Sequence, residues 1–159
     1  MENTVRNCFC GGELPFEQCC QSIIDGKVIP KNAVSLMRSR FTAYVIKNYP
    51  YILQTYATDQ RAKLTVKGLA NSAKDTQWLS LQVLGHQAHE KFSQVEFKAY
   101  YEFGNSYCVM HELSDFILEA GKWHYTSGEM QQGSGKFIPE RNSQCLCSSG
   151  KKFKKCCGR

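Results

Sequence analysis

The sequence has no apolar stretch long enough to cross a membrane, which excludes a helical integral membrane protein. It also lacks a phosphate-binding loop, a Gly-rich dinucleotide fingerprint, a Gly-x-Ser-x-Gly elbow and a His-Glu-x-x-His motif, the signatures of several enzyme classes. No hydrophobic signal segment follows Met1, so we expect a cytoplasmic protein whose thiols stay reduced. The length of 159 residues and the hydrophobic content of 42% are typical of one modest globular domain with appendages.

Cysteine is abundant, and eight of the nine cysteines form one pattern that occurs twice. Each copy contains Cys-x-Cys, then eight residues, then two adjacent cysteines, and an aromatic residue stands six positions after the second cysteine. A short loop that returns on itself in this way supplies two pairs of donors to a tetrahedral ion. The eight predicted metal ligands are Cys8, Cys10, Cys19 and Cys20 in the first copy and Cys145, Cys147, Cys156 and Cys157 in the second.

Thiolate donors favour zinc, with iron as the alternative, and we therefore expect two Zn²⁺ ions per chain. The ion would supply most of the folding energy of such short loops. Disulfides are the rival interpretation, but adjacent cysteines bond to each other only with strain. Both predicted sites have four protein ligands and no open position, which indicates structural rather than catalytic metal.

The second copy carries a specific resemblance. The segment 141–158 reads Arg-Asn-Ser-Gln-Cys-Leu-Cys-Ser-Ser-Gly-Lys-Lys-Phe-Lys-Lys-Cys-Cys-Gly and resembles the SEC-C motif, the zinc-binding tail of the SecA translocation ATPase. That family usually has glycine where Ser148 stands. The first copy retains the four ligand positions but has Glu17 and Gln18 in place of the basic pair. The resemblance therefore implies metal binding at both ends and a basic surface only at the second.

Two SEC-C motifs that flank the segment Leu-Met-Arg-Ser-Arg-Phe-Thr-Ala-Tyr at 36–44 make the whole chain similar to the YchJ-like bacterial proteins. That family is known by sequence and fold rather than by activity. The resemblance implies a middle domain of the nuclear transport factor 2-like (cystatin-like) fold, a cone of helices on a curved antiparallel sheet. The expected organisation is an N-terminal zinc module at 1–28, the middle domain at 29–132 and a basic C-terminal zinc module at 133–159.

The middle region independently predicts an α+β fold, because helical periodicity comes first and strand periodicity follows. Apolar residues at helical spacing predict a helix over 31–48, and two shorter helical stretches follow near 51–58 and 60–72. Alternation then predicts strands at 78–87, 94–103, 107–118 and 123–127, with turns at Gly104-Asn105 and Ala120-Gly121. The Gly- and Ser-containing segment 131–135 is interpreted as a linker to the terminal module.

The net charge of +6 comes entirely from the C-terminal segment. Residues 1–135 contain 13 basic and 13 acidic side chains, whereas residues 136–159 contain seven basic ones against Glu140 alone. One interpretation is a patch that contacts nucleic acid, the ribosome, anionic lipid or an acidic protein. The other is compensation for the negative charge of a metal-thiolate centre. The predicted partner-binding residues are Lys151, Lys152, Lys154 and Lys155.

Candidate pocket residues come from the middle domain, since a cone-shaped sheet encloses a pocket. His111 and His124 lie on strands that can be neighbours, and Asp115 is close enough in sequence to His111 for general acid–base work. A buried histidine with a structural hydrogen bond is the alternative for His111. Arg38 and Arg40 flank the apolar stripe of the long helix, either as an anion clamp at the pocket mouth or as structural ion-pair partners.

No catalytic residue is assigned, and the chain is interpreted as a binding or adaptor protein that uses its basic module. By resemblance to the SecA tail, the expected partner is a secretion chaperone or the ribosome. The alternatives are a small-molecule binder or enzyme that uses the middle pocket, and nucleic-acid binding through the tail, which the single aromatic residue in the basic run makes the weaker interpretation.

Overall fold

The computed structural model describes residues 7–159, so the first six residues of the predicted N-terminal module lie outside the described residues. Helices come first along the chain: α1 (Cys20–Ile24), α2 (Ala33–Val45), α3 (Tyr49–Gln54), α4 (Thr58–Arg61) and α5 (Val66–Ala73). The strands are β1 (Thr76–Ala88), β2 (Phe92–Phe103), β3 (Ser106–Glu119), β4 (Lys122–Met130) and β5 (Gly135–Phe137). The short 3₁₀ helices η1 (Phe16–Gln18) and η2 (Phe153–Lys155) belong to the two cysteine modules.

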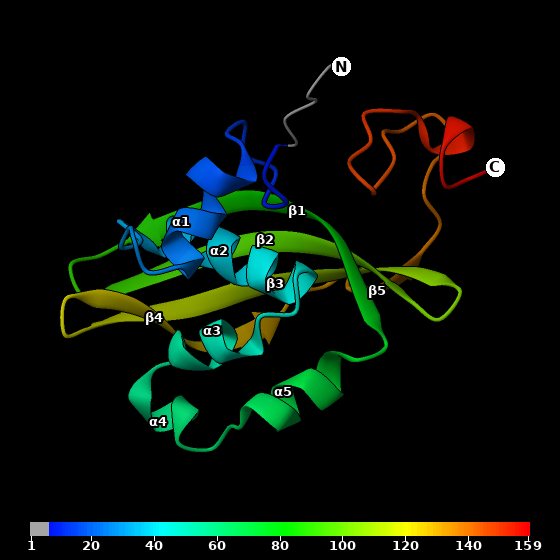
Figure 1. The fold of residues 1–159 in the computed structure, drawn as a ribbon. Coiled ribbons are helices and arrows are strands. Elements are labelled where there is room, and N and C mark those ends of the chain that lie inside the picture. Colours follow the sequence, from blue (N-terminus) through cyan, green and yellow to red (C-terminus); the bar gives the residue numbers. More distant parts are fainter. Residues whose placement is uncertain (1–6) are drawn as a thin grey trace.

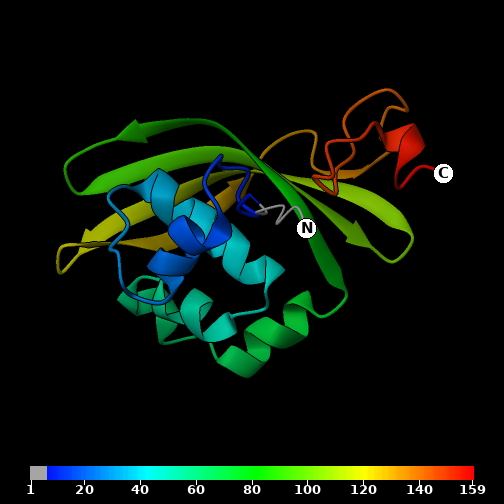
Figure 2. The ribbon, with the colours of Figure 1, turned by 45° about the horizontal axis from the view of Figure 1, so that its top comes forward.

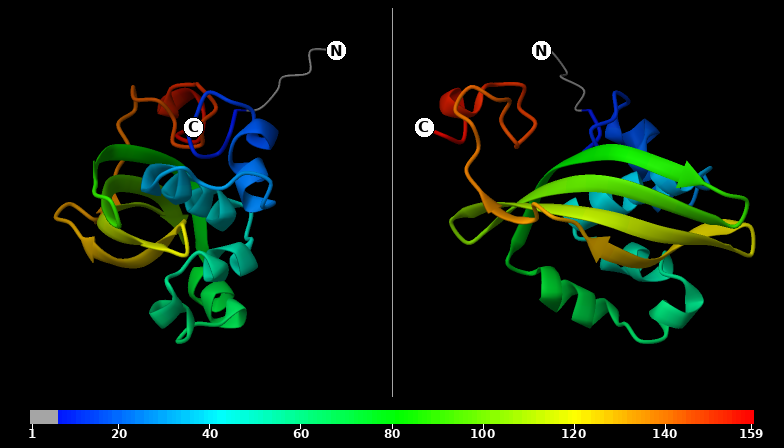
Figure 3. Two further views of the ribbon diagram at one scale, coloured as in Figure 1. Left: turned by 90° about the vertical axis from the view of Figure 1, so that its left-hand side faces the viewer. Right: turned by 180° about the vertical axis from the view of Figure 1, so that it is seen from behind.

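The sheet is antiparallel, with the strand order β1-β2-β3-β4, and all the α-helices lie on one of its faces (Figure 1). The far side of the sheet carries no helix, as the view from behind shows (Figure 3). One edge of β3 is shared: β4 pairs with its second half, Glu112–Glu119, and β5 pairs with Tyr107–Val109. The chain therefore leaves the sheet after β4 and re-enters it on the same edge before it reaches the C-terminal module.

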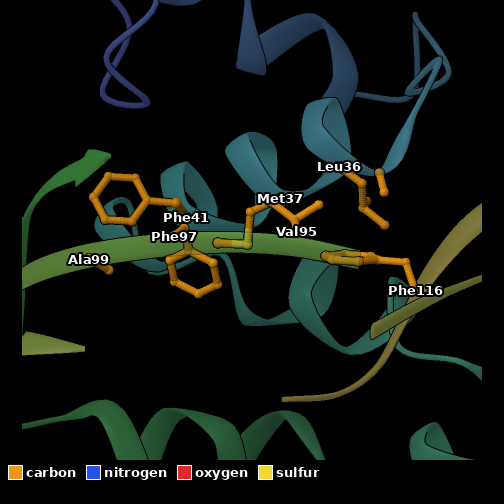
Figure 4. Close-up of a cluster of buried hydrophobic side chains, with 8 residues drawn as sticks. Leu36, Met37, Phe41, Val95, Phe97, Ala99 and Phe116 are labelled. Carbon is orange, nitrogen blue, oxygen red and sulfur yellow. The ribbon is translucent and has the colours of Figure 1, made fainter. Parts of the chain in front are cut away.

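Helix α2 begins where the side chain of Asn32 accepts a hydrogen bond of 2.8 Å from the backbone N–H of Ser35, an N-cap that satisfies one free donor of the first turn. Its apolar face packs on the sheet and forms the main core with side chains of β2 and with Phe116 of β3 (Figure 4). Side chains that alternate along β2 meet residues spaced three or four apart on α2, as the sequence pattern predicted. The buried members of this core are Ala33, Leu36, Met37, Phe41, Val95, Phe97, Ala99 and Phe116.

Two predicted segments differ from the structure. The helix predicted over 60–72 is divided into α4 and α5, because the hydroxyl of Thr65 accepts a hydrogen bond of 3.0 Å from the N–H of Gly68 and starts a new helix there. The linker predicted over 131–135 ends inside the sheet, since Gly135 is the first residue of β5. The C-terminal module is therefore attached to the sheet by hydrogen bonds rather than by flexible chain alone.

Among residues 7–159, no helix is both long enough and apolar enough to pass through a bilayer. All nine cysteines lie within these residues, and every one of them is free, so the structure contains none of the disulfides considered as the rival interpretation.

Candidate metal centres and the cavity beneath helix α2

The two cysteine modules adopt the same local fold, residue for residue. The N–H of Cys8 donates to the carbonyl of Leu14 at 2.9 Å, and the N–H of Cys145 donates to the carbonyl of Lys151 at 2.8 Å. Each module then makes one 3₁₀ turn, η1 or η2, that begins at its aromatic residue. Because this turn brings the adjacent cysteines back over the Cys-x-Cys pair, both loops bring four thiols together.

The sulfur atoms are spaced as a tetrahedral metal requires. In each module all four Sγ atoms lie within 4.8 Å of one another. The Sγ of Cys19 is 3.7 Å from that of Cys10, and the Sγ of Cys156 is 3.5 Å from that of Cys147. Zinc–sulfur bonds of about 2.3 Å place tetrahedral sulfur atoms about 3.8 Å apart. The donor sets therefore fit a four-coordinate thiophilic ion such as zinc without rearrangement.

Four thiols this close cannot all ionise unless a cation neutralises them. The side chain of Cys10 donates to Cys8 and holds the pKa of Cys8 far below its ordinary value. Burial, together with the close Cys10 sulfur, raises the pKa of Cys19 to about 12. In the second module, a hydrogen bond from Ser149 lowers the pKa of Cys147 to about 6. The contact between Cys157 and Cys145 raises the pKa of Cys157 to about 12. Only a bound metal stabilises all four thiolates at once.

The N-terminal module is built into the body of the protein. Cys8, Cys10 and Cys20 are all buried, and they form a small core with Phe16 and Ile24. Helix α1, which starts at Cys20, contacts α2 (Figure 2). This module therefore packs against α2 as part of the middle domain.

Two contacts to α2 fix the position of the N-terminal module. The guanidinium of Arg38 donates a hydrogen bond of 2.8 Å from Nη1 to the carbonyl of Cys10. The Sγ of Cys8 lies 3.9 Å from the hydroxyl oxygen of the fully buried Thr42. A change at the N-terminal metal site therefore reaches the central helix directly.

The C-terminal module lies beyond the end of the sheet and is more exposed (Figures 1 and 3). Cys145 is buried, but Cys157 is exposed. The ring of Phe153 packs edge-on against Tyr107 of β3, with ring centres 5.6 Å apart. Ser148 has a φ of 63°, the left-handed region that favours glycine, at the position that corresponds to Gly11 with a φ of 84°. The two modules thus share one fold but differ in how they contact the middle domain.

A cavity of about 300 Å³ lies beneath α2, between this helix, the sheet and the loop after α3. Arg40 is 4% exposed and donates from Nη1 to the hydroxyl of Thr55 at 2.6 Å and to the carbonyl of Ile52 at 3.2 Å. Its guanidinium carbon lies 4.5 Å from the ring centres of both Tyr56 and Tyr125, a cation–π contact on two sides. The loop before α4 holds this arrangement, because Thr55 and Ala57 exchange backbone hydrogen bonds with Tyr125.

Opposite this arginine, Glu112 of β3 is 8% exposed. Its Oε1 accepts hydrogen bonds from the hydroxyls of Ser114 at 2.7 Å and Tyr125 at 2.8 Å. Burial, together with the negative charge of Glu112, raises the pKa of Tyr125 well above its ordinary value, so this phenol keeps its proton and remains a donor. The cavity therefore contains a buried arginine and a buried glutamate, and Tyr125 contacts both of them through its ring and its hydroxyl.

Comparison with known proteins agrees with the fold of the middle domain and with the C-terminal cysteine module. Residues 32–128 match the family model of the middle NTF2-like domain of YchJ, and residues 141–159 match the SEC-C motif. The chain belongs to the YchJ-like family.

Similarity to relatives in this family extends over nearly the whole chain. A UPF0225 protein of Serratia proteamaculans is 40% identical and covers 96% of this chain and 97% of its own length. The crystal structure of a SEC-C motif-containing protein from Psychrobacter arcticus is 30% identical, covers 99% of this chain and 98% of its own, and superposes with a TM-score of 0.69. The solution structure of RPA3114, a SEC-C motif-containing protein from Rhodopseudomonas palustris, is 28% identical, covers 80% of this chain and 100% of its own, and gives a TM-score of 0.76.

In this YchJ-like chain, one of the five predicted pocket residues, Arg40, lines the cavity. Arg38 instead bonds to Cys10 on the N-terminal module. His111 and Asp115 lie on the opposite face of β3, where Nε2 of His111 is 2.7 Å from a carboxylate oxygen of Glu96 and Asp115 accepts from Gln94 at 2.8 Å. The predicted His111–Asp115 pair therefore does not meet in the cavity.

His124, the fifth predicted pocket residue, is also outside the cavity of this family member. Its Nδ1 lies 2.9 Å from the carbonyl of Lys122 and 4.0 Å from a carboxylate oxygen of Glu119, near the turn between β3 and β4. Although it precedes Tyr125 in the sequence, none of its contacts reaches the groups around Arg40.

Glu112 and Tyr125 line the cavity together with Arg40, and neither is among the five predicted pocket residues. The alternation of β3 contains the signal: Met110, Glu112, Ser114 and Phe116 share one face. That face looked polar in the sequence, whereas the opposite face contains Tyr107, Val109 and Leu113 and looked like the core. Because the polar side chains of Glu112 and Ser114 line the cavity, the face of β3 that points inward could be mistaken in the sequence for the solvent face.

Proposed function

We propose that this chain is a zinc-binding adaptor whose C-terminal module contacts an acidic surface on a partner protein or on the ribosome. The observation that carries the proposal is the contrast between Phe153 and the lysines around it. Phe153 packs on Tyr107 of the sheet, whereas the lysines before and after it are exposed. The four residues in question are Lys151, Lys152, Lys154 and Lys155.

None of these four lysines has an ion-pair partner among residues 7–159. The ion pairs within residues 7–159 join His111 to Glu96 and His124 to Glu119, so no carboxylate of the described residues neutralises a lysine of η2. The matching positions of the N-terminal copy contain Glu17 and Gln18. The positive surface is therefore confined to one end of the molecule, where it favours association with an acidic partner. By resemblance to the SecA tail, a secretion chaperone and the ribosome are the first partners to test.

We expect reversal of all four lysines to glutamate to abolish this association. The change replaces a positive surface by a negative one and should reduce binding at least tenfold, because like charges across an interface are strongly unfavourable. Binding of the wild-type chain and the variant is measured with the purified secretion chaperone by calorimetry and with purified ribosomes by co-sedimentation.

Two matched controls separate surface charge from net charge and from folding. Changing the same four lysines to arginine keeps the charge and should keep the binding. Changing four exposed lysines of the middle domain to glutamate gives the same net charge and should also keep it; these are Lys63, Lys67, Lys74 and Lys91. Undiminished binding by the η2 reversal would remove the module from the proposed function. Binding of single-stranded nucleic acid in its place, with the steep loss on added salt that phosphate contacts cause, would favour the nucleic-acid alternative.

The proposal includes two zinc ions per chain in a reducing compartment such as the cytoplasm. We expect protein purified without added metal to contain two zinc ions, and the double substitution of Cys145 and Cys147 by serine to leave one, since each module supplies its own four donors. Metal content is measured by atomic emission on protein of known concentration. Iron in place of zinc, or a single ion per wild-type chain, would contradict this part of the proposal.

A further inference from the structure

One residue that lines the cavity beneath α2 has a donor without an acceptor. Trp78 of β1 lines the cavity, and its Nε1 is fully buried with no hydrogen-bond partner in the part of the chain that the structure describes. The indole ring itself is well packed, with the rings of Phe41 and Tyr101 at centre distances of 6.3 and 5.0 Å. A buried indole N–H usually has a partner, because removal from water without one is costly. This donor therefore points to an acceptor that is not part of the protein.

The two charged groups of the cavity also have free capacity. Within residues 7–159, Arg40 uses only Nη1 for its hydrogen bonds, and Glu112 uses only Oε1. The two side chains line the same cavity, but no ion pair joins them. Their charges cancel across the cavity, so its interior favours a molecule without net charge that can both accept and donate.

The rest of the cavity limits the size and the body of such a molecule. The volume of about 300 Å³ is at the lower end of the range of ligand pockets. Apolar and aromatic side chains make up most of the wall, among them Met37, Phe41, Phe97 and Met110. These dimensions exclude a lipid or a peptide and leave room for a small flat molecule.

We propose that this cavity binds a small neutral molecule with an apolar body and a polar head that accepts a hydrogen bond from Trp78 and donates one to Glu112. An aromatic carboxamide is the simplest compound of this class, since its ring fits the apolar wall, its carbonyl accepts and its amide nitrogen donates. The site is independent of the metal centres and of the basic module, and its use would make the middle domain a ligand-binding unit.

The test is a titration of the full-length, metal-loaded protein with benzamide. The indole N–H signals in ¹H–¹⁵N NMR spectra report binding at each step. The chain has two tryptophans, and Trp123 provides an internal control because it does not line the cavity. We expect the Trp78 indole signal to shift downfield in a saturable way while that of Trp123 stays in place. Benzoate, of the same shape but with a negative charge, should bind at least tenfold more weakly.

Two variants make the test specific to the proposed contacts. Trp78→Phe removes the N–H but keeps an aromatic ring, and it should weaken benzamide binding at least tenfold, as judged by the shifts of methyl signals from the cavity. Glu112→Gln keeps the shape of the side chain and should weaken it to a similar degree, whereas Trp123→Phe should leave it unchanged. Melting curves show whether each variant is folded. An unmoved Trp78 signal at the solubility limit of benzamide, or stronger binding of benzoate, overturns the proposal.

Discussion

Substitution of Cys20 by serine is expected to destabilise the entire chain, whereas the corresponding substitution of Cys157 is expected to leave the middle domain nearly unchanged. Cys20 is 1% exposed, starts α1 and belongs to the buried cluster that contacts α2. Loss of one of four ligands weakens metal binding, and metal binding is folding free energy for such modules. We expect a loss of about 3–5 kcal/mol for Cys20→Ser. For a chain of this size, such a loss lowers the melting temperature by roughly 10 °C.

Cys157→Ser is the matched control, because the same atom is changed at the same position of the repeated motif. Cys157 is exposed, and its module contacts the sheet mainly through β5 and Phe153. We expect its effect on the unfolding of the middle domain to stay below about 1 kcal/mol, the range of surface changes. Calorimetry with and without a chelator measures both variants. Equal losses for the two cysteines would show that the N-terminal module is not part of the core.

Gly128→Ala is expected to have the second-largest effect, although it adds a single methyl group. A Cβ atom at this position of β4 would overlap the carboxylate of Glu112 and lie 2.7 Å from the hydroxyl of Tyr125. Glu112 would have to leave its place, and the buried hydroxyls of Ser114 and Tyr125 would lose their acceptor. Loss of a charge-assisted buried pair of this kind costs about 2–4 kcal/mol. Denaturation with urea measures this loss.

Gly85→Ala in β1 is the control for the general effect of alanine in a strand, because a Cβ atom there meets nothing within 4 Å. It should change the stability by less than about 0.5 kcal/mol. In the Glu112→Ala background, the cost of Gly128→Ala should fall by more than half, since the group that it displaces is already gone. An unchanged cost in that background would attribute the effect to the backbone of β4 rather than to Glu112.

The order of helices and strands could be predicted from the sequence because local pattern determines it. Alternation over Val95, Phe97 and Ala99 identified β2 and its buried face, and helical spacing identified α2. The spacing of the cysteines likewise identified two sets of donors, since each set brings four thiols together within one short loop. These features depend on residues that are close in the chain.

The environment of each group could not be predicted, because contacts between distant segments decide it. Nothing in the sequence near Arg38 indicates that it bonds to the carbonyl of Cys10, 28 positions earlier. His111 was considered for the pocket because its strand can lie beside that of His124 and Asp115 is near in sequence, but the cavity lies on the face of Glu112. The short strand β5 was not predicted, and its first residue, Gly135, was interpreted as the end of a linker, since a strand of three residues carries no periodic signal.

The different surroundings of the two cysteine modules also determine how freely each can diverge. A substitution in the N-terminal copy has to remain compatible with Arg38 and Thr42 of α2, so its loop and that helix are expected to change together. The C-terminal copy meets the sheet through few residues, and its outward positions can change charge without cost to the fold. One cysteine pattern, placed at both ends of a chain, is therefore expected to be constrained in the first copy and free to vary in the second, where new binding specificities can arise.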